Sequence, residues 1–150
     1  MCDTHFKPVQ RDQAAFFAHE LAELIPEDDL IFSIIHVVER MDLSKLLIKY
    51  DSLGQNAFHP AMMLSILYYA YCMGIFSSRK IEEAIKYDVR FMYAASMYSI
   101  SFNRINEFRK TNWDIIQEYF LEIVKLCGKL GMLPPGFISI DGTKIQASAR

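Results

Sequence analysis

The sequence has little of what disulfide-linked or zinc-binding proteins require. It holds three cysteines, an odd number, and they lie far apart in the chain. This arrangement argues against a disulfide framework and suits a reducing compartment. The four histidines share no regular spacing with one another or with the cysteines, so a zinc site is not expected. These residues are Cys2, Cys72, Cys127, His5, His19, His36 and His59.

A long apolar run is also absent. The longest one, residues 61–76, contains Ser65 and several tyrosines, and it is shorter than the roughly 20 apolar residues that a membrane span requires. The N-terminus has no basic segment followed by an apolar one, so no signal peptide is predicted. We therefore expect a cytoplasmic protein with no membrane partner.

What the chain does have is enough apolar material for a core. Of its 150 residues 52% are apolar, and they include 11 Phe and 8 Tyr. This length suits one ordinary domain that folds rather than staying disordered. The charge is uneven, because residues 1–75 hold five Lys or Arg against ten Asp or Glu, and residues 76–150 hold eleven against eight. A basic second half is compatible with a nucleic-acid-facing surface, although such shifts are also common in other proteins.

Apolar residues recur at helical spacing before residue 131, which predicts a mainly α-helical domain over residues 12–131. In the first half, Asp12 is expected to cap a helix that Pro26 ends, and Pro26 also suits the first turn of the next helix. Asp42 is expected to cap a short helix, and His59 with Pro60 to open the most apolar one, which ends near Gly74. The expected inward-facing residues include Phe16, Phe17, Leu21, Leu24, Ile31, Ile34, Ile35, Val38, Leu43, Leu46, Leu47, Tyr50, Leu64, Leu67, Tyr68 and Tyr71.

In the second half, helix starts are predicted at Ser77 or Ser78, at Asp88 and at Ser101. Thr111 with Asp114 resembles a capping box for a last helix that ends at Gly131. On the first of these helices Arg79, Lys80, Glu82, Glu83 and Lys86 are expected to face outward.

After a Pro-Pro-Gly turn the periodicity changes to that of a strand. Residues 137–140 are Phe-Ile-Ser-Ile, and Asp141 and Gly142 follow them. An Asp-Gly pair between apolar runs is a strong hairpin signal. The sequence therefore predicts a short C-terminal β-hairpin over residues 137–150.

An ordered set of short motifs spans about residues 15–149. In chain order these are Tyr50 with Gly54, Phe58-His59-Pro60, Leu67-Tyr68, Gly74, Ser77-Ser78-Arg79-Lys80-Ile81-Glu82-Glu83-Ala84, Asp88-Val89, Phe108-Arg109-Lys110 and Asp141-Gly142-Thr143-Lys144-Ile145. The set resembles the N-terminal domain of insertion-sequence transposases of the InsH type, running into the first strand of their DDE catalytic core. The resemblance implies a helical domain that binds transposon-end DNA, with the terminal inverted repeats as partner, and a role in DNA transposition and recombination.

The resemblance also implies an RNase H-like domain in which three acidic residues hold two divalent metal ions. Two metals can stabilise the attacking and leaving oxygens of an in-line displacement, and Mg²⁺ prefers hard oxygen ligands. Asp141 matches the first acidic residue, both as a catalytic residue and as a metal ligand of an intact core. Only that one is present here, so the expectation is a truncated, catalytically incomplete chain that by itself holds no cofactor.

The candidate DNA-binding segment is residues 77–110. Its three short helices could form a helix-turn-helix-like unit, with the helix over residues 101–110 offered to the major groove. Arginines there can pair with guanine, while lysines contact phosphates; for any one of these residues the alternative is a solvated helix face. The candidate DNA-binding residues are Arg79, Lys80, Arg90, Arg104, Arg109 and Lys110.

Two alternative functions stay open from the sequence. A shortened transposase could be regulatory, by competing with the intact enzyme for the DNA ends or by forming mixed oligomers with it or with copies of itself. The acidic first half also fits a structural helical domain without DNA affinity.

Overall fold

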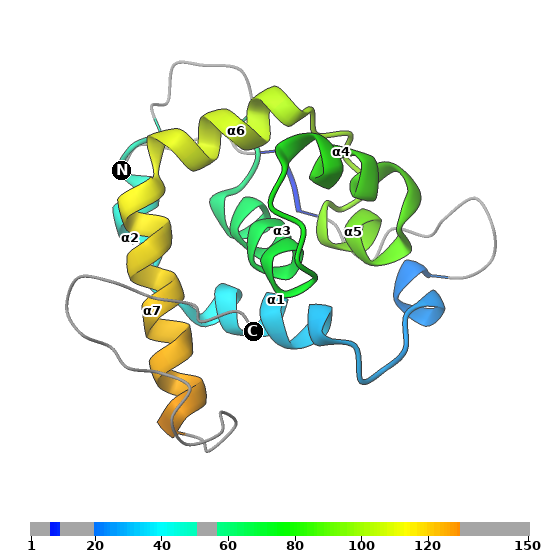
Figure 1. Cartoon of the computed structure of the whole chain (residues 1–150), viewed down its shortest axis with the longest axis horizontal. Coiled ribbons are helices and arrows are strands. Elements are labelled where there is room, and N and C mark those ends of the chain that lie inside the picture. Colours follow the sequence, from blue (N-terminus) through cyan, green and yellow to red (C-terminus); the bar gives the residue numbers. More distant parts are fainter. Residues whose placement is uncertain (1–6, 10–19, 51–56, 130–150) are drawn as a thin grey trace, which may run out of the picture. The chain divides into compact units, whose positions relative to one another are not determined.

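The computed structural model of the chain describes residues 7–9, 20–50 and 57–129. These residues form one 3-10 helix and seven α-helices and contain no β-strand, so the predicted mainly α-helical fold is confirmed (Figure 1). None of the described helices is both long and apolar enough to cross a membrane. The elements are the 3-10 helix Leu21–Leu24, α1 Leu30–Arg40, α2 Ser44–Leu47, α3 Pro60–Cys72, α4 Ser78–Tyr87, α5 Val89–Ala94, α6 Phe102–Thr111 and α7 Trp113–Lys129.

Helix α3 is the centre of the core, as its apolar sequence predicts. Every residue from Pro60 to Ala70 is buried, which is typical of a helix that is hydrophobic on all sides. The helix begins where His59 Nδ1 accepts a hydrogen bond from the Ala61 N–H at 3.2 Å, and Pro60 occupies its first turn. It ends in a Schellman motif at Gly74, whose φ of 74° places it in the left-handed region that favours glycine.

Helices α1 and α5 both pack against α3 (Figure 1). Helix α1 contributes Ile31, Ile35 and Val38 to the core. From α5, Phe91 lies with its ring centroid 5.1 Å from that of Tyr69 on α3. These two rings are almost fully buried, so their contact lies within the core.

Helix boundaries differ from the sequence prediction at two places. Helix α1 begins at Leu30 and not at Pro26, because Asp29 Oδ1 accepts a hydrogen bond from the Ile31 N–H at 2.9 Å and so caps the helix. Thr111 does not cap the last helix. It is the final residue of α6. Asn112 follows as the C-cap, and its N–H donates to the Phe108 carbonyl at 3.1 Å.

Two leucines that the sequence predicts to face inward are exposed. The 3-10 turn buries Leu21 but leaves Leu24 58% exposed, and the short helix α2 buries Leu46 but leaves Leu47 exposed. Each of these elements is a single turn, so it buries only the residue that points to the core.

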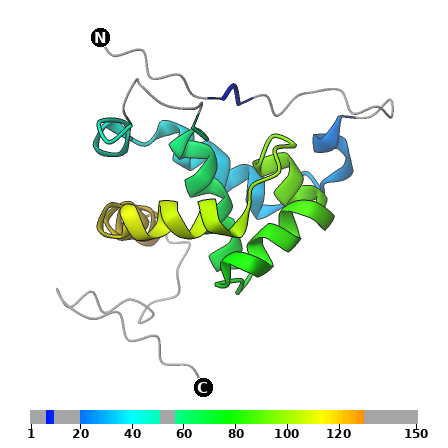
Figure 2. The same ribbon diagram turned by 90° about the horizontal axis from the view of Figure 1, so that it is seen from above.

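The described chain divides into two compact units, residues up to 117 and residues from 118 onward. The described part of the second unit is the remainder of α7. Within the first unit α4 packs against both α5 and α6 (Figure 2). The predicted hairpin over residues 137–150 lies outside the described residues.

Candidate nucleic-acid interface

Helices α4 and α6 pack against each other (Figure 2). Near one end of the pair, the Arg109 guanidinium donates hydrogen bonds to the Phe76 carbonyl at 2.7 Å and to Ser78 Oγ at 3.0 Å. In the middle of α4, Glu82 Oε2 accepts a hydrogen bond from the N–H of Phe102, the first residue of α6, at 3.0 Å. Side-chain hydrogen bonds therefore join α4 to α6 near both ends of α6.

Glu82 caps α6 from a different helix. The N-cap residue Ser101 makes no side-chain capping bond, and the carboxylate of Glu82 satisfies a backbone N–H that would otherwise be unpaired at the helix start. Its hydrogen bond to Lys86 and then that to the Phe102 N–H lower the pKa of Glu82. Glu82, which the sequence predicts to face outward, is partly exposed and also joins α4 to α6.

Two of the six predicted DNA-binding residues, Arg90 and Arg109, are held by protein partners. Arg109 joins α6 to the start of α4, as described above. Arg90 donates from Nε to Asp88 Oδ1 at 2.9 Å and from Nη2 to Asp88 Oδ2 at 2.6 Å, and it lies 3.7 Å from Asp29. The hydrogen bonds to Asp88 raise the pKa of Arg90 and lower that of Asp88. In the structure both guanidinium groups therefore stabilise helix packing.

The other four predicted residues lie on exposed positions of α4 and α6. Arg79 lies over the Phe102 ring, 5.2 Å from its centroid, which is a cation–π geometry. Arg104 is 59% exposed and makes a 3.4 Å ion pair with Glu107. Neither Lys80 nor Lys110 makes an ion pair or side-chain hydrogen bond with any described residue. We refer to Arg79, Lys80, Arg104 and Lys110 as the α4–α6 cations.

Asp141, the predicted catalytic and metal-binding residue, lies outside the described residues. Within residues 7–9, 20–50 and 57–129, no three His, Cys, Asp or Glu side chains gather where they could hold a metal ion. The Mg²⁺ expectation concerns an intact catalytic core and stays a prediction.

Sequence reasoning does not find Glu82 and Asn112, two residues that shape this face of the molecule. The only local signal for Glu82 is its spacing of four residues from Lys86, with which it forms a 2.8 Å ion pair. Asn112 is 4% exposed, and its Nδ2 donates to the Phe108 carbonyl at 2.9 Å. The capping role of Glu82 is not visible without its contact with the distant Phe102 N–H.

Comparison with known proteins identifies the class of this domain. The family model Transposase domain (DUF772) matches residues 19–111, which include α1 to α6. The chain therefore belongs to this family of transposase domains, and membership implies interaction with DNA in general. Searches of curated proteins and of solved structures gave no match.

Proposed function

We propose that this domain binds the end of a transposable element through the face of α4 and α6 that carries the α4–α6 cations. The family match over residues 19–111 supports an action on DNA, and the exposed cations provide the chemistry that phosphates require. The ordered motifs favour an InsH-type transposase. On that reading the chain continues into an RNase H-like core, with Asp141 as its first acidic ligand for Mg²⁺.

The observation that carries the proposal is the way α6 is fixed. Three side-chain hydrogen bonds join this helix to α4 and to Phe76 before it. Ile105 and Phe108 on its inner side are buried in the core. A stripe that contains Arg104 and Lys110 stays exposed on the same helix. A rigidly held helix with exposed cations is how helix-turn-helix proteins present a recognition helix to the major groove, so α4, α5 and α6 form the proposed DNA-binding unit.

The six arginines and lysines predicted from the sequence receive different roles in this proposal. Arg104 is placed to contact base edges, and Arg79, Lys80 and Lys110 to contact phosphates. Arg90 and Arg109 are positioning residues, because they act through the packing of α5 and α6. The regulatory alternative, competition with an intact transposase for the same ends or mixed oligomers, uses the same face.

The test is binding of the full chain to a duplex that carries the element's terminal inverted repeat, compared with a scrambled duplex, over a range of salt concentrations. Neutralising the two unpaired lysines together, by Lys80→Gln and Lys110→Gln, is expected to weaken both complexes and to lower the log–log salt slope by about 2, about one for each phosphate contact. Arg104→Gln is expected to weaken repeat binding by about 1–3 kcal/mol and to reduce the preference over the scrambled duplex.

The matched control is Lys45→Gln, which removes an exposed lysine from α2 and should leave the salt slope unchanged. If Lys45→Gln lowers the salt slope by about one, the amount expected for each of Lys80 and Lys110, the interface lies elsewhere. If the wild-type chain shows neither a preference for the repeat nor a salt dependence, the domain is a structural one without DNA affinity.

A further inference from the structure

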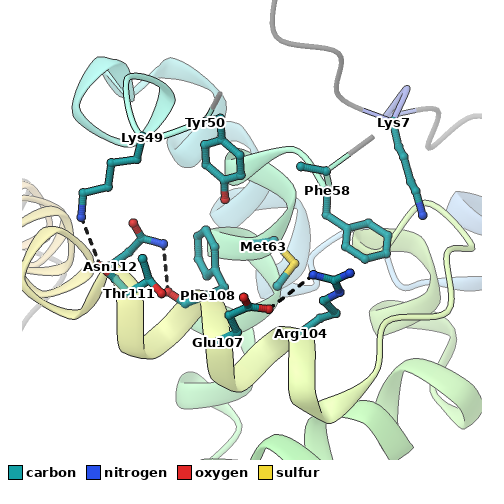
Figure 3. Close-up of a pocket in the computed structure, with 11 residues that line it drawn as sticks. Lys7, Lys49, Tyr50, Phe58, Met63, Arg104, Glu107, Phe108, Thr111 and Asn112 are labelled. Carbon is teal, nitrogen blue, oxygen red and sulfur yellow. Dashed lines mark hydrogen bonds and ion pairs between the residues drawn. The ribbon is translucent and has the colours of Figure 1, made fainter. Parts of the chain in front are cut away.

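A pocket of about 550 Å³ opens beside α6 in the first unit (Figure 3). Its wall contains three aromatic side chains, Tyr50, Phe58 and Phe108. In Figure 3 the hydroxyl of Tyr50 points toward the Phe108 ring, and Phe58 lies further along the pocket. The volume falls within the roughly 300–1,000 Å³ of small-molecule sites. The pocket therefore has room for a flat, apolar group between aromatic walls.

The charged side chains around this pocket are mostly positive. Among the described residues that line it, Lys7, Lys49 and Arg104 are cationic and Glu107 is the one carboxylate. Lys7 lies 4.4 Å above the centroid of the Phe58 ring, and Lys49 Nζ donates to the Thr111 carbonyl at the end of α6 at 3.1 Å. These positions put cations at two separate ends of the pocket (Figure 3). An anionic group would balance the excess positive charge.

The pocket also contains a buried acceptor. Asn112 lines it, and while Nδ2 donates to the Phe108 carbonyl, Oδ1 is buried and accepts no hydrogen bond from the described residues. In Figure 3 this oxygen is on the side of Lys49 and Tyr50. Buried amide oxygens are nearly always hydrogen-bonded, so a ligand that brings an N–H or O–H donor to this point would satisfy it.

Tyr50 stays neutral at the pocket wall. Burial, and then the nearby negative charge of Glu107, raise the pKa of its hydroxyl to about 12. At neutral pH the ring is therefore uncharged and offers a face suited to stacking.

We propose that this pocket receives one unstacked nucleotide of a DNA strand, with its base between Tyr50 and Phe108, an N–H of its pairing edge on Asn112 Oδ1, and its phosphate at Lys49. An unpaired nucleotide is the one class of DNA group that combines a stacking face, an exposed donor and an anion. The inference rests on the proposed function only in taking DNA as the ligand. Its location beside Arg104 makes it continuous with the proposed DNA-binding face.

The experiment compares a blunt duplex with the same duplex that carries a short single-stranded overhang containing a fluorescent adenine analogue. The full chain is expected to bind the overhang duplex at least about fivefold more tightly, the effect of stacking one base on an aromatic side chain. The fluorescence of the analogue is expected to fall on binding, since stacking quenches it. A single-stranded oligonucleotide without a duplex is expected to show the same quenching.

Tyr50→Leu is expected to remove the preference for the overhang and the quenching while leaving binding of the blunt duplex unchanged. Asn112→Leu should do the same, and its fold is checked by thermal unfolding because this residue is buried. The matched control is Tyr87→Leu, which removes a tyrosine that is 79% exposed and does not line the pocket. It should retain both the preference and the quenching.

Several results would overturn the proposal. Equal affinity for both duplexes without quenching would exclude a nucleotide pocket but leave the proposed function standing. Quenching that persists in Tyr50→Leu would place the stacking site elsewhere. An acidic peptide that binds in a Tyr50-dependent manner, with no quenching by any oligonucleotide, would assign the pocket to a protein partner. Quenching with the single strand but no binding of the blunt duplex would instead support the pocket and contradict the proposed duplex interface.

Discussion

Two regions of the first unit use basic side chains in opposite ways. Around α5, Arg90 contacts Asp88, Asp29 and the ring of Tyr69, whose centroid lies 5.8 Å away. On α4 and α6, Lys80 and Lys110 have no charged or hydrogen-bonding partner among the described residues. A basic residue whose hydrogen bonds are satisfied within the fold contributes to stability, whereas one without a partner is available for a ligand. Spacing on a helix does not distinguish the two cases.

The largest expected effect is on the free energy of unfolding, at the buried contact between α5 and α3. Phe91→Ala removes a ring that is 1% exposed and lies against Tyr69, and it is expected to lower the free energy of unfolding by about 3–5 kcal/mol. Urea denaturation followed by circular dichroism measures this change. Tyr87→Ala, at an exposed position of α4, should change the same quantity by less than about 0.5 kcal/mol. Similar losses in both variants would break the distinction between the two regions.

The next largest effect is at Asp29, which caps α1 and accepts a hydrogen bond from the Tyr69 hydroxyl at 3.0 Å. Asp29→Ala is expected to destabilise the fold by about 2 kcal/mol, because it removes an N-cap and leaves a partly buried hydroxyl unpaired. Asp29→Asn keeps both acceptor functions and loses only the charge facing Arg90. If the Asn variant is as unstable as the Ala variant, the ion pair and not the hydrogen bonds stabilises this region.

Lowering the pH tests the contribution of Asp88 to the stability of the region around α5. Its hydrogen bonds to Arg90 hold the pKa of this carboxylate below its ordinary value of 3.8. A lowered pKa stabilises the folded state above the unfolded pKa, and the contribution disappears as the pH falls through the folded one. The free energy of unfolding should therefore decrease between about pH 5 and pH 2. We expect the share of Asp88 to be about 1 kcal/mol, since the pair is partly exposed to water.

Urea titrations of the wild type and of Asp88→Asn over this pH range measure that share. The Asn variant keeps an acceptor for the Arg90 N–H at the start of α5 but no longer titrates. Its acid-dependent loss of stability should be smaller by the stated amount, and an identical loss in both proteins would contradict the role of the pair.

Local chemistry made most helix starts predictable from the sequence. His59 before Pro60, Asp88 and Ser101 all precede helices as predicted, because capping and proline geometry depend on neighbours in the chain. The start of α1 was harder, since Pro26 and Asp29 offer competing signals three residues apart. Asp29 forms the cap, and the Tyr69 hydroxyl also bonds to it, a contact that no local pattern reveals.

The candidate interface was only partly predictable for the same reason. The sequence places six basic residues on three helices, but whether a cation is enclosed depends on residues far along the chain, such as Phe76 for Arg109 and Asp29 for Arg90. The cap that Glu82 supplies to α6 is likewise tertiary. Helical spacing thus indicates which residues can be exposed, and long-range contacts decide which remain so.

The smallest predicted effect lies in the link between the two regions. Helix α5 ends in a Schellman motif like that of α3, with Ser96 N–H bonded to the Tyr93 carbonyl and Met97 N–H to the Met92 carbonyl. Where α3 has Gly74, α5 has Ser96 at a φ of 49°, and Ser96 Oγ is buried without a hydrogen-bond partner among the described residues.

Ser96→Gly should therefore raise the free energy of unfolding by about 0.5 kcal/mol, since relief of the left-handed strain and of the unpaired hydroxyl outweighs the added chain entropy. Gly74→Ala, in which the added methyl meets no atom within 4 Å, isolates the conformational cost and should lower stability by a similar amount. A destabilised Ser96→Gly would mean that this serine has a partner that holds the connection from α5 to α6 in place.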